Sequence, residues 1–369
     1  MTTEDIALTF VARLGVRGTV HLLETFGSAR GIYAAGADAL VGRAELNADI
    51  ARRIAAGEGM DMARREEEYC RRHGIAALAS TDADYPAMMR TGTSDYPHVI
   101  YVQGRTDILN GRLVSIVGTR RCSAMSDHMC LKLVEELAAA VPELVVVSGL
   151  AFGVDSQAHR AALACGVPTV AIIPEVLPGV VPANHAALAR DIVARGGAIV
   201  SELNSATRRN GAYYIPRNRL IAAISEGTVV VESPLDGGAL KTAMMADSYN
   251  RQVMAVPGRP TDPKSAGPNA LIRRNIAHLV TSGNDIVDTL GWPRTGGRTA
   301  AADDDADAAM TDDERMVMAA FGSDDSADAD TLAARTGMDI GRVLTALMML
   351  ELGGKIGAAA GNNYKRTGR

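Results

Sequence analysis

The sequence lacks the features that mark membrane, secreted and zinc-binding proteins. Its 369 residues contain no uninterrupted apolar run of about 18 residues, the length that a membrane-spanning helix requires. The segment that comes nearest, 137–154, is interrupted by Pro142, Glu143 and Ser148. The N-terminal stretch MTTEDIALTF has no basic region followed by an apolar run, so we expect no secretory signal. The four cysteines show neither a CxxC pair nor metal-ligand spacing, and we interpret them as reduced core thiols of a cytoplasmic protein.

A uniform excess of one charge is also absent. Residues 301–330 hold eleven acidic side chains and one arginine, a net charge of −10, whereas the whole chain has a net charge of −5. The other 339 residues therefore carry +5. Because most of the chain is mildly basic, the low overall pI is compatible with an anionic partner.

The first 75 residues have a helical pattern that glycines interrupt at 15–18 and 57–59. We predict a helical domain over 1–75, of the SAM or helix-hairpin-helix type. The stretch from Leu14 to Gly18 is similar to a helix-hairpin-helix turn, whose backbone N–H groups hold a phosphate. A plain junction between two helices is the simpler interpretation.

From residue 113 onwards, short β-rich runs alternate with helical stretches. This alternation predicts an α/β domain over 76–292, a doubly wound parallel sheet with helices on both faces. Ligands of such sheets bind beyond the carboxyl ends of the strands, so the residues that follow each strand are the functional candidates. The predicted strands are 113–117, 144–147, 169–173, 198–201, 228–232, 253–256 and 278–281.

The segment 293–310 is rich in Gly, Ala and Asp and predicts an acidic flexible linker. After it, 311–369 has the pattern of a helix-turn-helix with a hairpin wing. Its third helix is expected to place Ile340, Val343, Leu344 and Leu347 on one face. Charges over 331–352 cancel, whereas a strong reader of duplex DNA has a basic recognition helix. We expect partner docking or weak DNA contact from this winged-helix-like domain.

The turn after the first strand of the sheet is suited to an anion. Gly118-Thr119-Arg120 combines free N–H groups, a helix N-terminus and a guanidinium. It is not a GxGxxG motif, and no acidic residue is placed to hold a ribose, so a dinucleotide cofactor is poorly supported. A plain turn with solvated arginines remains the alternative.

The turn after the second strand carries Gly149 and Gly153, which permit close approach of a ligand to the backbone. Asp155 and His159, four residues apart, could form an acid–base pair. No nucleophile spacing accompanies them, so we interpret Asp155 as a helix cap and His159 as a packing residue.

Residues 213–225, YYIPRNRLIAAIS, place two arginines at the start of an apolar helix. Pro216 fits the first helical turn, and Arg217, Asn218 and Arg219 are expected to share that turn. Cations there are unfavourable for the helix alone, and a bound anion would reverse the sign. Tyr214 offers a ring on which a base can stack. The alternative is an arginine–carboxylate network with core tyrosines.

Two more strand-to-helix loops, 234–242 and 257–274, repeat the combination of glycines with cations. Several anion-binding loops at one edge of a sheet fit consecutive phosphates better than one small ligand. A polynucleotide is therefore the favoured partner.

Seven ordered motifs resemble those of the DNA-processing protein A (DprA/Smf) family over about 85–285. They are SIVGTRRCS, VVSGLAFGVDSQAH, GGAIVSE, YIPRNRLIAAIS, VVVES, GGALKTA and AVPG…SAGPNALIR. The resemblance implies an extended Rossmann-like fold and a homodimer that binds single-stranded DNA. It further implies that the protein protects incoming DNA and loads the RecA recombinase during natural transformation. It implies no catalysis, and we expect neither a cofactor nor a metal.

Position by position, the resemblance implies the following DNA-binding residues: Arg120, Tyr214, Arg217, Asn218, Arg219, Gly238, Lys241, Thr242 and Asn269. To these we add Gly118 and Gly149 from the two turns described above. The four cationic side chains among them would contact phosphates. Gly118 and Gly149 would allow close backbone approach, and Tyr214 would stack on a base. The chain departs from the family at Phe152, where many members have arginine. It departs again at Gly211, where some members have a lysine for which Arg208 or Arg209 is the candidate substitute.

Two other functions remain open at this stage. A Rossmann-type hydrolase of nucleotides or phosphoribosyl compounds would need a poised carboxylate, for which Glu202, Glu226 and Glu232 are candidates. The PGGxGT-like loop of such enzymes is absent. A pure protein scaffold would not require the arginines of 213–225.

Overall fold

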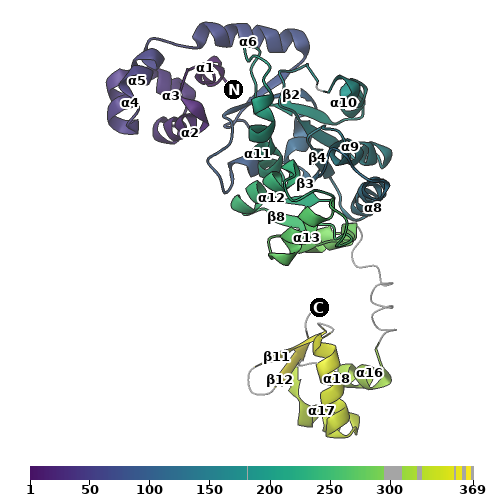
Figure 1. Cartoon of the computed structure of the whole chain (residues 1–369). Coiled ribbons are helices and arrows are strands. Elements are labelled where there is room, and N and C mark those ends of the chain that lie inside the picture. The colour runs from purple at the N-terminus through teal and green to yellow at the C-terminus, as the bar shows by residue number, and fades with distance from the viewer. Residues whose placement is uncertain (181, 295–309, 322–325, 353–354, 360–362, 367–369) are drawn as a thin grey trace. The chain divides into compact units, whose positions relative to one another are not determined.

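The chain folds as two units, Met1–Thr295 and Gly296–Arg369, each with its own hydrophobic core. The structure, a computed structural model, describes residues 1–180, 182–294, 310–321, 326–352, 355–359 and 363–366 (Figure 1). Most of the predicted acidic linker, residues 295–309, therefore lies outside the described residues.

A nine-stranded sheet forms the centre of the first unit, in the order β1-β2-β6-β5-β4-β3-β7-β8-β9. All seven predicted strands form, and they run parallel to one another. Two strands that periodicity did not predict, β1 and β2, extend one edge in antiparallel pairing. The strands are β1 (Ala76–Ala79), β2 (Val99–Gly104), β3 (Arg112–Val117), β4 (Leu144–Ser148), β5 (Thr169–Ile172), β6 (Ala198–Ser201), β7 (Gly227–Val230), β8 (Gln252–Ala255) and β9 (His278–Leu279).

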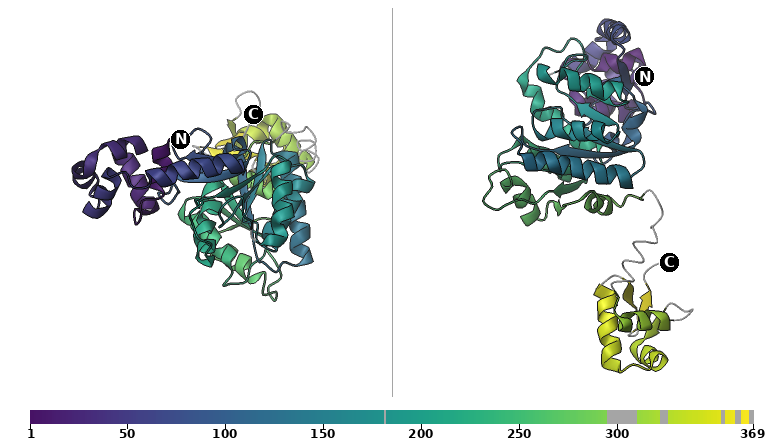
Figure 2. Two further views of the ribbon diagram at one scale, coloured as in Figure 1. Left: turned by 90° about the horizontal axis from the view of Figure 1, so that it is seen from above. Right: turned by 90° about the vertical axis from the view of Figure 1, so that its right-hand side faces the viewer.

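Helices cover both faces of this sheet, as expected for a doubly wound fold. Figure 1 shows α11 and α12 on one side and α8 and α9 on the other, and the views of Figure 2 agree. Apolar residues of α11, α12 and α13 form one core layer, and those of α8, α9 and α14 form the other. The helices are α7 (Ala87–Arg90), α8 (Ala124–Ala140), α9 (Val154–Ala164), α10 (Ala186–Ala194), α11 (Tyr214–Ile224), α12 (Gly238–Ser248), α13 (Ala266–Arg273) and α14 (Gly283–Leu290), with short 3-10 turns at 107–110, 183–185 and 211–213.

The chain leaves β3 towards one end of the sheet and returns through β7 on the other side of β3. The carboxyl ends of β3 and β7 therefore border the topological switch point, where the connections diverge and leave a crevice. This position is the one in which ligands of doubly wound sheets bind.

Six helices precede the sheet, and the first five share a core of their own, which includes Leu22, Ile32 and Leu40. The predicted turn Leu14–Gly18 opens α2, without a side-chain cap. The helices are α1 (Thr3–Leu8), α2 (Gly15–Phe26), α3 (Ala29–Ala34), α4 (Gly36–Ala44), α5 (Ala48–Ala55) and α6 (Met60–His73).

Buried polar contacts join these helices to the sheet. His98 on the sheet side contacts Asp5 of α1 through Nε2 (2.9 Å) and Ser80 through Nδ1 (2.8 Å). All three side chains are buried. The N-terminal helices are therefore attached to the α/β body by specific contacts within the first unit.

The second unit packs three helices on a small sheet of order β10-β12-β11. The predicted apolar face of the third helix needs correction. Val343 and Leu347 are buried, but Ile340 and Leu344 are exposed, and the buried face continues instead through Ala346 and Leu350. The elements are α16 (Asp312–Ala320), β10 (Ser326–Asp328), α17 (Ala329–Thr336), α18 (Ile340–Leu352), β11 (Ile356–Ala359) and β12 (Asn363–Arg366).

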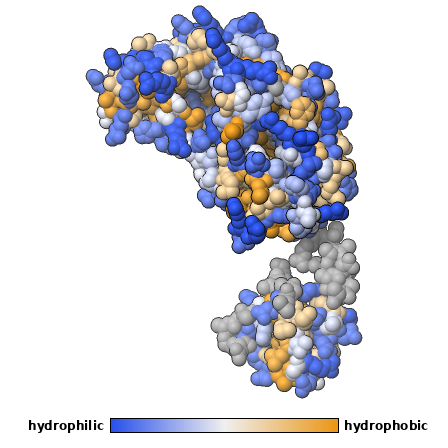
Figure 3. Space-filling model, viewed as in Figure 1, coloured by the Kyte–Doolittle hydropathy of each residue, from blue (hydrophilic) through white to orange (hydrophobic). Residues whose placement is uncertain are grey.

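On the face shown in Figure 3, apolar side chains occur in small groups between hydrophilic ones. Within the described residues, no helix has both the length and the apolar character needed to cross a membrane.

Candidate functional site

A small pocket of about 230 Å³ lies at the switch point, between the loops that follow β3, β4 and β7. We call it the switch-point pocket. The first residues after each of these strands and one face of α11 form its walls. Six of the eleven residues predicted for the site line it: Gly118, Arg120, Arg217, Asn218, Gly238 and Thr242. Segments more than 100 residues apart in sequence thus contribute to one cavity.

Arg217 forms the inner wall of the pocket and is only 4% exposed. Its Nη1 donates to the carbonyl oxygens of Gly149 (2.7 Å) and Ile172, at the ends of β4 and β5. Burial lowers the pKa of Arg217 to about 10, while the negative charge of Asp155 opposes this shift. The guanidinium is therefore held by backbone carbonyls, and the charge of the buried Asp155 favours its protonated form.

The start of α11 differs from the sequence prediction. The helix begins at Tyr214, so Pro216 is in the first turn but Arg217, Asn218 and Arg219 come after it. The two arginine side chains are buried rather than placed at the helix mouth. Because they reach partners on other elements, they do not depend on an anion at the helix terminus.

Gly149 and Gly118, both predicted to let a ligand approach the backbone, are instead in close contact with side chains of the protein. A Cβ on Gly149 would lie 2.6 Å from Asp155 Oδ2 and 2.8 Å from Arg217 Nη1. A Cβ on Gly118 would lie 2.5 Å from Val154 Cγ2. The absence of a side chain at both positions lets the pocket walls close, whatever ligand the pocket holds.

Arg120 is the exposed cation of the pocket. Its guanidinium carbon lies 5.3 Å from the centre of the Tyr214 ring, within the range of a cation–π contact. Within the described part of the chain, no carboxylate lies within ion-pair distance of Arg120. The charge of Arg120 acts on the buried Asp155 of the same pocket, but the exposed guanidinium forms no ion pair in the described residues.

Arg219 and Asn269 lie outside the switch-point pocket. Arg219 donates to both oxygens of Glu202 (3.1 and 2.6 Å) and to Asp95 (3.3 Å), which is the carboxylate network considered as the alternative. Asn269 bridges Gly258 through its amide, accepting from the N–H (3.1 Å) and donating to the C=O (2.9 Å). Both side chains have partners within the protein.

Lys241 is exposed and lines a neighbouring apolar groove between α12 and α13. It comes from the same loop-to-helix segment as Gly238 and Thr242 of the pocket. A second cation is therefore available close to the pocket along the chain.

Two residues that sequence reasoning undervalued stand at the second turn. Asp155 is buried against Arg217; burial raises its pKa, and Arg217 opposes the rise. It is the second residue of α9 rather than its cap, which is Gly153. Phe152 is 46% exposed, and its ring meets the His185 ring edge-on at 4.8 Å. The exposed phenylalanine could have been noticed, because it is the one apolar aromatic in a loop at a strand end.

The carboxylates considered for a hydrolase are engaged elsewhere. Glu202 pairs with Arg219, and Glu226 accepts from the Trp292 indole (2.9 Å). Glu232 accepts from the backbone and hydroxyl of Ser123. No group of His, Cys, Asp and Glu side chains in the described residues could hold a metal ion.

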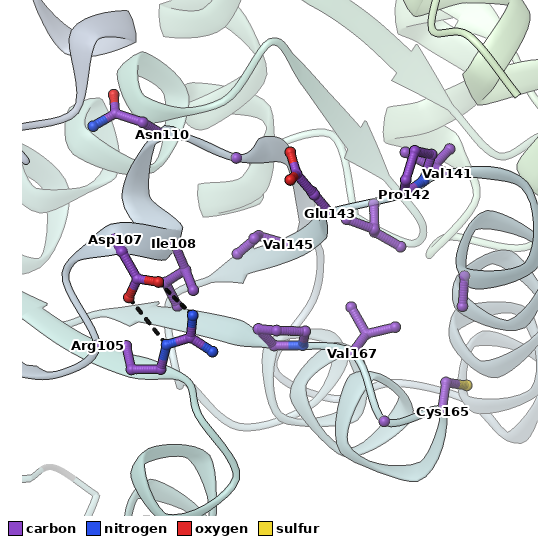
Figure 4. Close-up of a pocket in the computed structure, with 15 residues that line it drawn as sticks. Arg105, Asp107, Ile108, Asn110, Val141, Pro142, Glu143, Val145, Cys165 and Val167 are labelled. Atoms are coloured by element: carbon purple, nitrogen blue, oxygen red, sulfur yellow. Dashed lines mark hydrogen bonds and ion pairs between the residues drawn. The ribbon is translucent and has the colours of Figure 1, made fainter. Parts of the chain in front are cut away.

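A larger pocket, of about 530 Å³, lies at the opposite edge, where β3, β4 and β5 begin (Figure 4). Its one arginine, Arg105, is exposed and makes two contacts with Asp107, one of them at 3.0 Å. Glu143 adds a further negative charge. None of the predicted site residues lines this pocket.

Comparison with known proteins connects this architecture to one family. The family model described as DNA recombination-mediator protein A matches residues 76–291, and that of the DprA winged helix domain matches 300–362. Protein Smf of Escherichia coli is 32% identical over 289 residues, which cover 77% of this chain and 76% of that protein.

Two solved structures are also similar. DNA processing protein A of Streptococcus pneumoniae is 27% identical with a TM-score of 0.66, covering 78% of this chain and 98% of that one. DNA processing protein A of Helicobacter pylori, described with its mode of binding single-stranded DNA, is 27% identical with a TM-score of 0.51, covering 58% and 95%.

Proposed function

Because the chain belongs to the DNA recombination-mediator protein A family, we propose that it binds single-stranded DNA at the switch-point pocket. The observation that carries the proposal is Arg120. It is an exposed guanidinium at the carboxyl edge, stacked on Tyr214 and without a carboxylate partner in the described residues. A cation beside aromatic surface is the combination that single-strand binders use for phosphates and bases.

The contacts divide by exposure. Arg120 and Lys241 bind phosphates, whereas buried Arg217 presents its remaining N–H groups from the pocket floor and shapes the cavity. Gly238 and Thr242 border the same cavity. Arg219, Asn269, Gly118 and Gly149 act through the fold, because their contacts lie within the protein.

Base contacts come from aromatic rings at this edge. Tyr214 already stacks against Arg120, and a base can extend that stack. Phe152 offers a second exposed ring on the neighbouring turn. At Gly153, that turn packs directly on the backbone of Thr119 and Arg120. We include Phe152 as a stacking residue of the site.

Fluorescence anisotropy with labelled oligo-dT and with a duplex of equal length tests the proposal. We expect tighter binding to the single strand and an affinity that falls steeply with salt, because each neutralised phosphate releases counterions. Equal affinity for both ligands, or an affinity independent of salt, would rule the proposed function out.

In the cell, the same surface would serve a recombination mediator without a catalytic step of its own. We propose that a cytoplasmic homodimer protects incoming strands and loads RecA on them during natural transformation. Family membership supports this role. RecA ATP hydrolysis on strands covered by single-strand-binding protein should start sooner when the chain is added. An unchanged lag before ATP hydrolysis would contradict RecA loading. A monomeric mass in solution would contradict the homodimer.

A further inference from the structure

Glu66 of α6 is a buried carboxylate whose partners all belong to a distant loop. The residue is 2% exposed. Its two oxygens accept the backbone N–H of Ser205 (2.9 and 3.0 Å), and one of them also accepts the Ser205 hydroxyl. Among the described residues, no cation lies within ion-pair distance of Glu66. Burying a carboxylate is costly without strong hydrogen bonds, so the Glu66–Ser205 contact compensates for that burial.

Ser205 lies in the segment between β6 and α11, residues 202–213, which we call the basic loop. The loop has no helix or strand before the 3-10 turn at 211–213. Two other hydrogen bonds lie near Ser205. The Thr207 N–H donates to the Asn204 carbonyl oxygen within the loop (3.0 Å), and Asn204 Nδ2 donates to the Thr9 hydroxyl over a longer distance (3.4 Å). Glu66 is therefore the strongest external attachment of its middle part.

Arg208 and Arg209 follow Ser205 by three and four residues, and both are exposed. Arg209 Nε forms an ion pair with Glu175 Oε1 (3.3 Å), while Arg208 has no ion pair within the described residues. The same loop leads directly into α11, which carries Tyr214 and Arg217 of the switch-point pocket. Ser205 is thus a fixed point three and four residues before two further cations, of which Arg209 is also held by Glu175.

We propose that Glu66 is a positioning residue: it fixes the basic loop so that Arg208 and Arg209 extend the phosphate-binding track. The inference rests on the proposed binding of single-stranded DNA. This gives the N-terminal helices a role in DNA binding without any DNA contact of their own. Glu66 of α6 holds the basic loop, and the arginines of that loop contact the DNA.

The test measures oligo-dT affinity across a salt series for four proteins: wild type, Arg208→Ala/Arg209→Ala, Glu66→Ala, and the combination of all three changes. Losing two phosphate contacts lowers the slope of log affinity against log salt by about 1.4 and the affinity about tenfold at about 0.15 M salt. Glu66→Ala should reproduce much of this loss. The combination should bind no worse than Arg208→Ala/Arg209→Ala.

Glu68→Ala is the matched control, because Glu68 lies on the same helix but is exposed and pairs with Arg71. It should bind like wild type. Ser205→Ala removes the hydroxyl without touching α6, and it should shift the slope in the same direction by less. This second variant keeps the test valid if Glu66→Ala unfolds.

Three results would overturn the inference: an unchanged salt slope for both Glu66→Ala and Ser205→Ala, a further loss in the combination, or no effect of Arg208→Ala/Arg209→Ala. None of these affects the proposed function, which fails if wild type shows no preference for the single strand or an affinity independent of salt.

Discussion

The two edges of the sheet differ in how their cations are used. At the amino edge, a cavity of about 530 Å³ holds one arginine that is already paired with Asp107. At the carboxyl edge, a cavity of about 230 Å³ holds Arg120, which has no carboxylate partner in the described residues, and the buried Arg217. The larger cavity thus has less capacity to bind an anion. The proposed site therefore rests on the charge left unpaired rather than on the volume of the cavity.

The topology explains why the difference falls this way. In a parallel sheet the helices that follow the strands begin at the carboxyl edge, and α9 and α12 both start beside the switch-point pocket. Helix N-termini attract negative charge through their free N–H groups. Arg217 and Arg219 are stabilised there by partners within the protein, whereas the exposed Arg120 forms no ion pair in the described residues and would gain from a bound anion.

The largest expected effect comes from removing Arg217. Arg217→Ala leaves the carbonyls of Gly149 and Ile172 without their donor and the buried Asp155 without its cation. Removing one of two buried, oppositely charged groups costs about 3–5 kcal/mol, so the urea midpoint should fall markedly. Arg105→Ala, at the exposed amino edge, should leave the midpoint unchanged. Equal midpoints for both variants would remove the structural contrast between the edges.

Phe152→Ala tests whether the carboxyl edge also contacts bases. Oligo-dT affinity should fall by about 1–3 kcal/mol, the contribution of one base stacked on an aromatic ring. Phe152→Trp should retain binding, and Val41→Ala, an exposed apolar residue of α4, should have no effect. An abasic strand of equal length should bind wild type and Phe152→Ala alike. If the abasic strand also distinguishes them, the ring does not act by stacking.

The fold was largely predictable, because buried parallel strands read as continuous apolar runs such as 144–147 and 253–256. β1 escaped prediction because its sequence, Ala-Ala-Leu-Ala, has little strand propensity. Its pairing with β2 depends on a sheet that exists only after folding. The exposed Ile340 and Leu344 show the limit of periodicity in a short amphipathic helix, where more than one apolar face fits the pattern.

The pocket residues were predictable as a group, since each follows a strand and all strand ends meet at one edge. Their individual contacts were not. Glu202 and Asp95 are 17 and 124 residues away from Arg219, and no local pattern indicates such a pair. Likewise, the closeness of Val154 to Gly118 appears only when α9 packs on β3. Sequence spacing locates cations, whereas their partners depend on the tertiary structure.

The buried His159, in α9, allows a test of how stability depends on pH. Burial, and then the charges of His185 and Arg217, lowers its pKa to about 3, far below the usual value. Below about pH 6.5 the unfolded chain binds a proton that the folded chain does not. The free energy of unfolding should therefore fall by about 2 kcal/mol between about pH 7 and about pH 5. His159→Gln should flatten this dependence, and His278→Gln, at an exposed site, should not. Parallel curves for wild type and His159→Gln would contradict the assignment.

The smallest effect tests the comparison of the edges most directly. Arg120→Ala removes one phosphate contact from the carboxyl edge, so the affinity for oligo-dT should fall about fourfold at about 0.15 M salt, and the salt slope should decrease by about 0.7. Arg105→Ala removes a cation of equal charge from the amino edge, and net charge changes identically in both variants. If binding followed net charge alone, the two salt series would coincide. A difference between them, with only Arg120→Ala losing slope, would place the strand at the carboxyl edge, whereas a loss confined to Arg105→Ala would move it to the larger pocket.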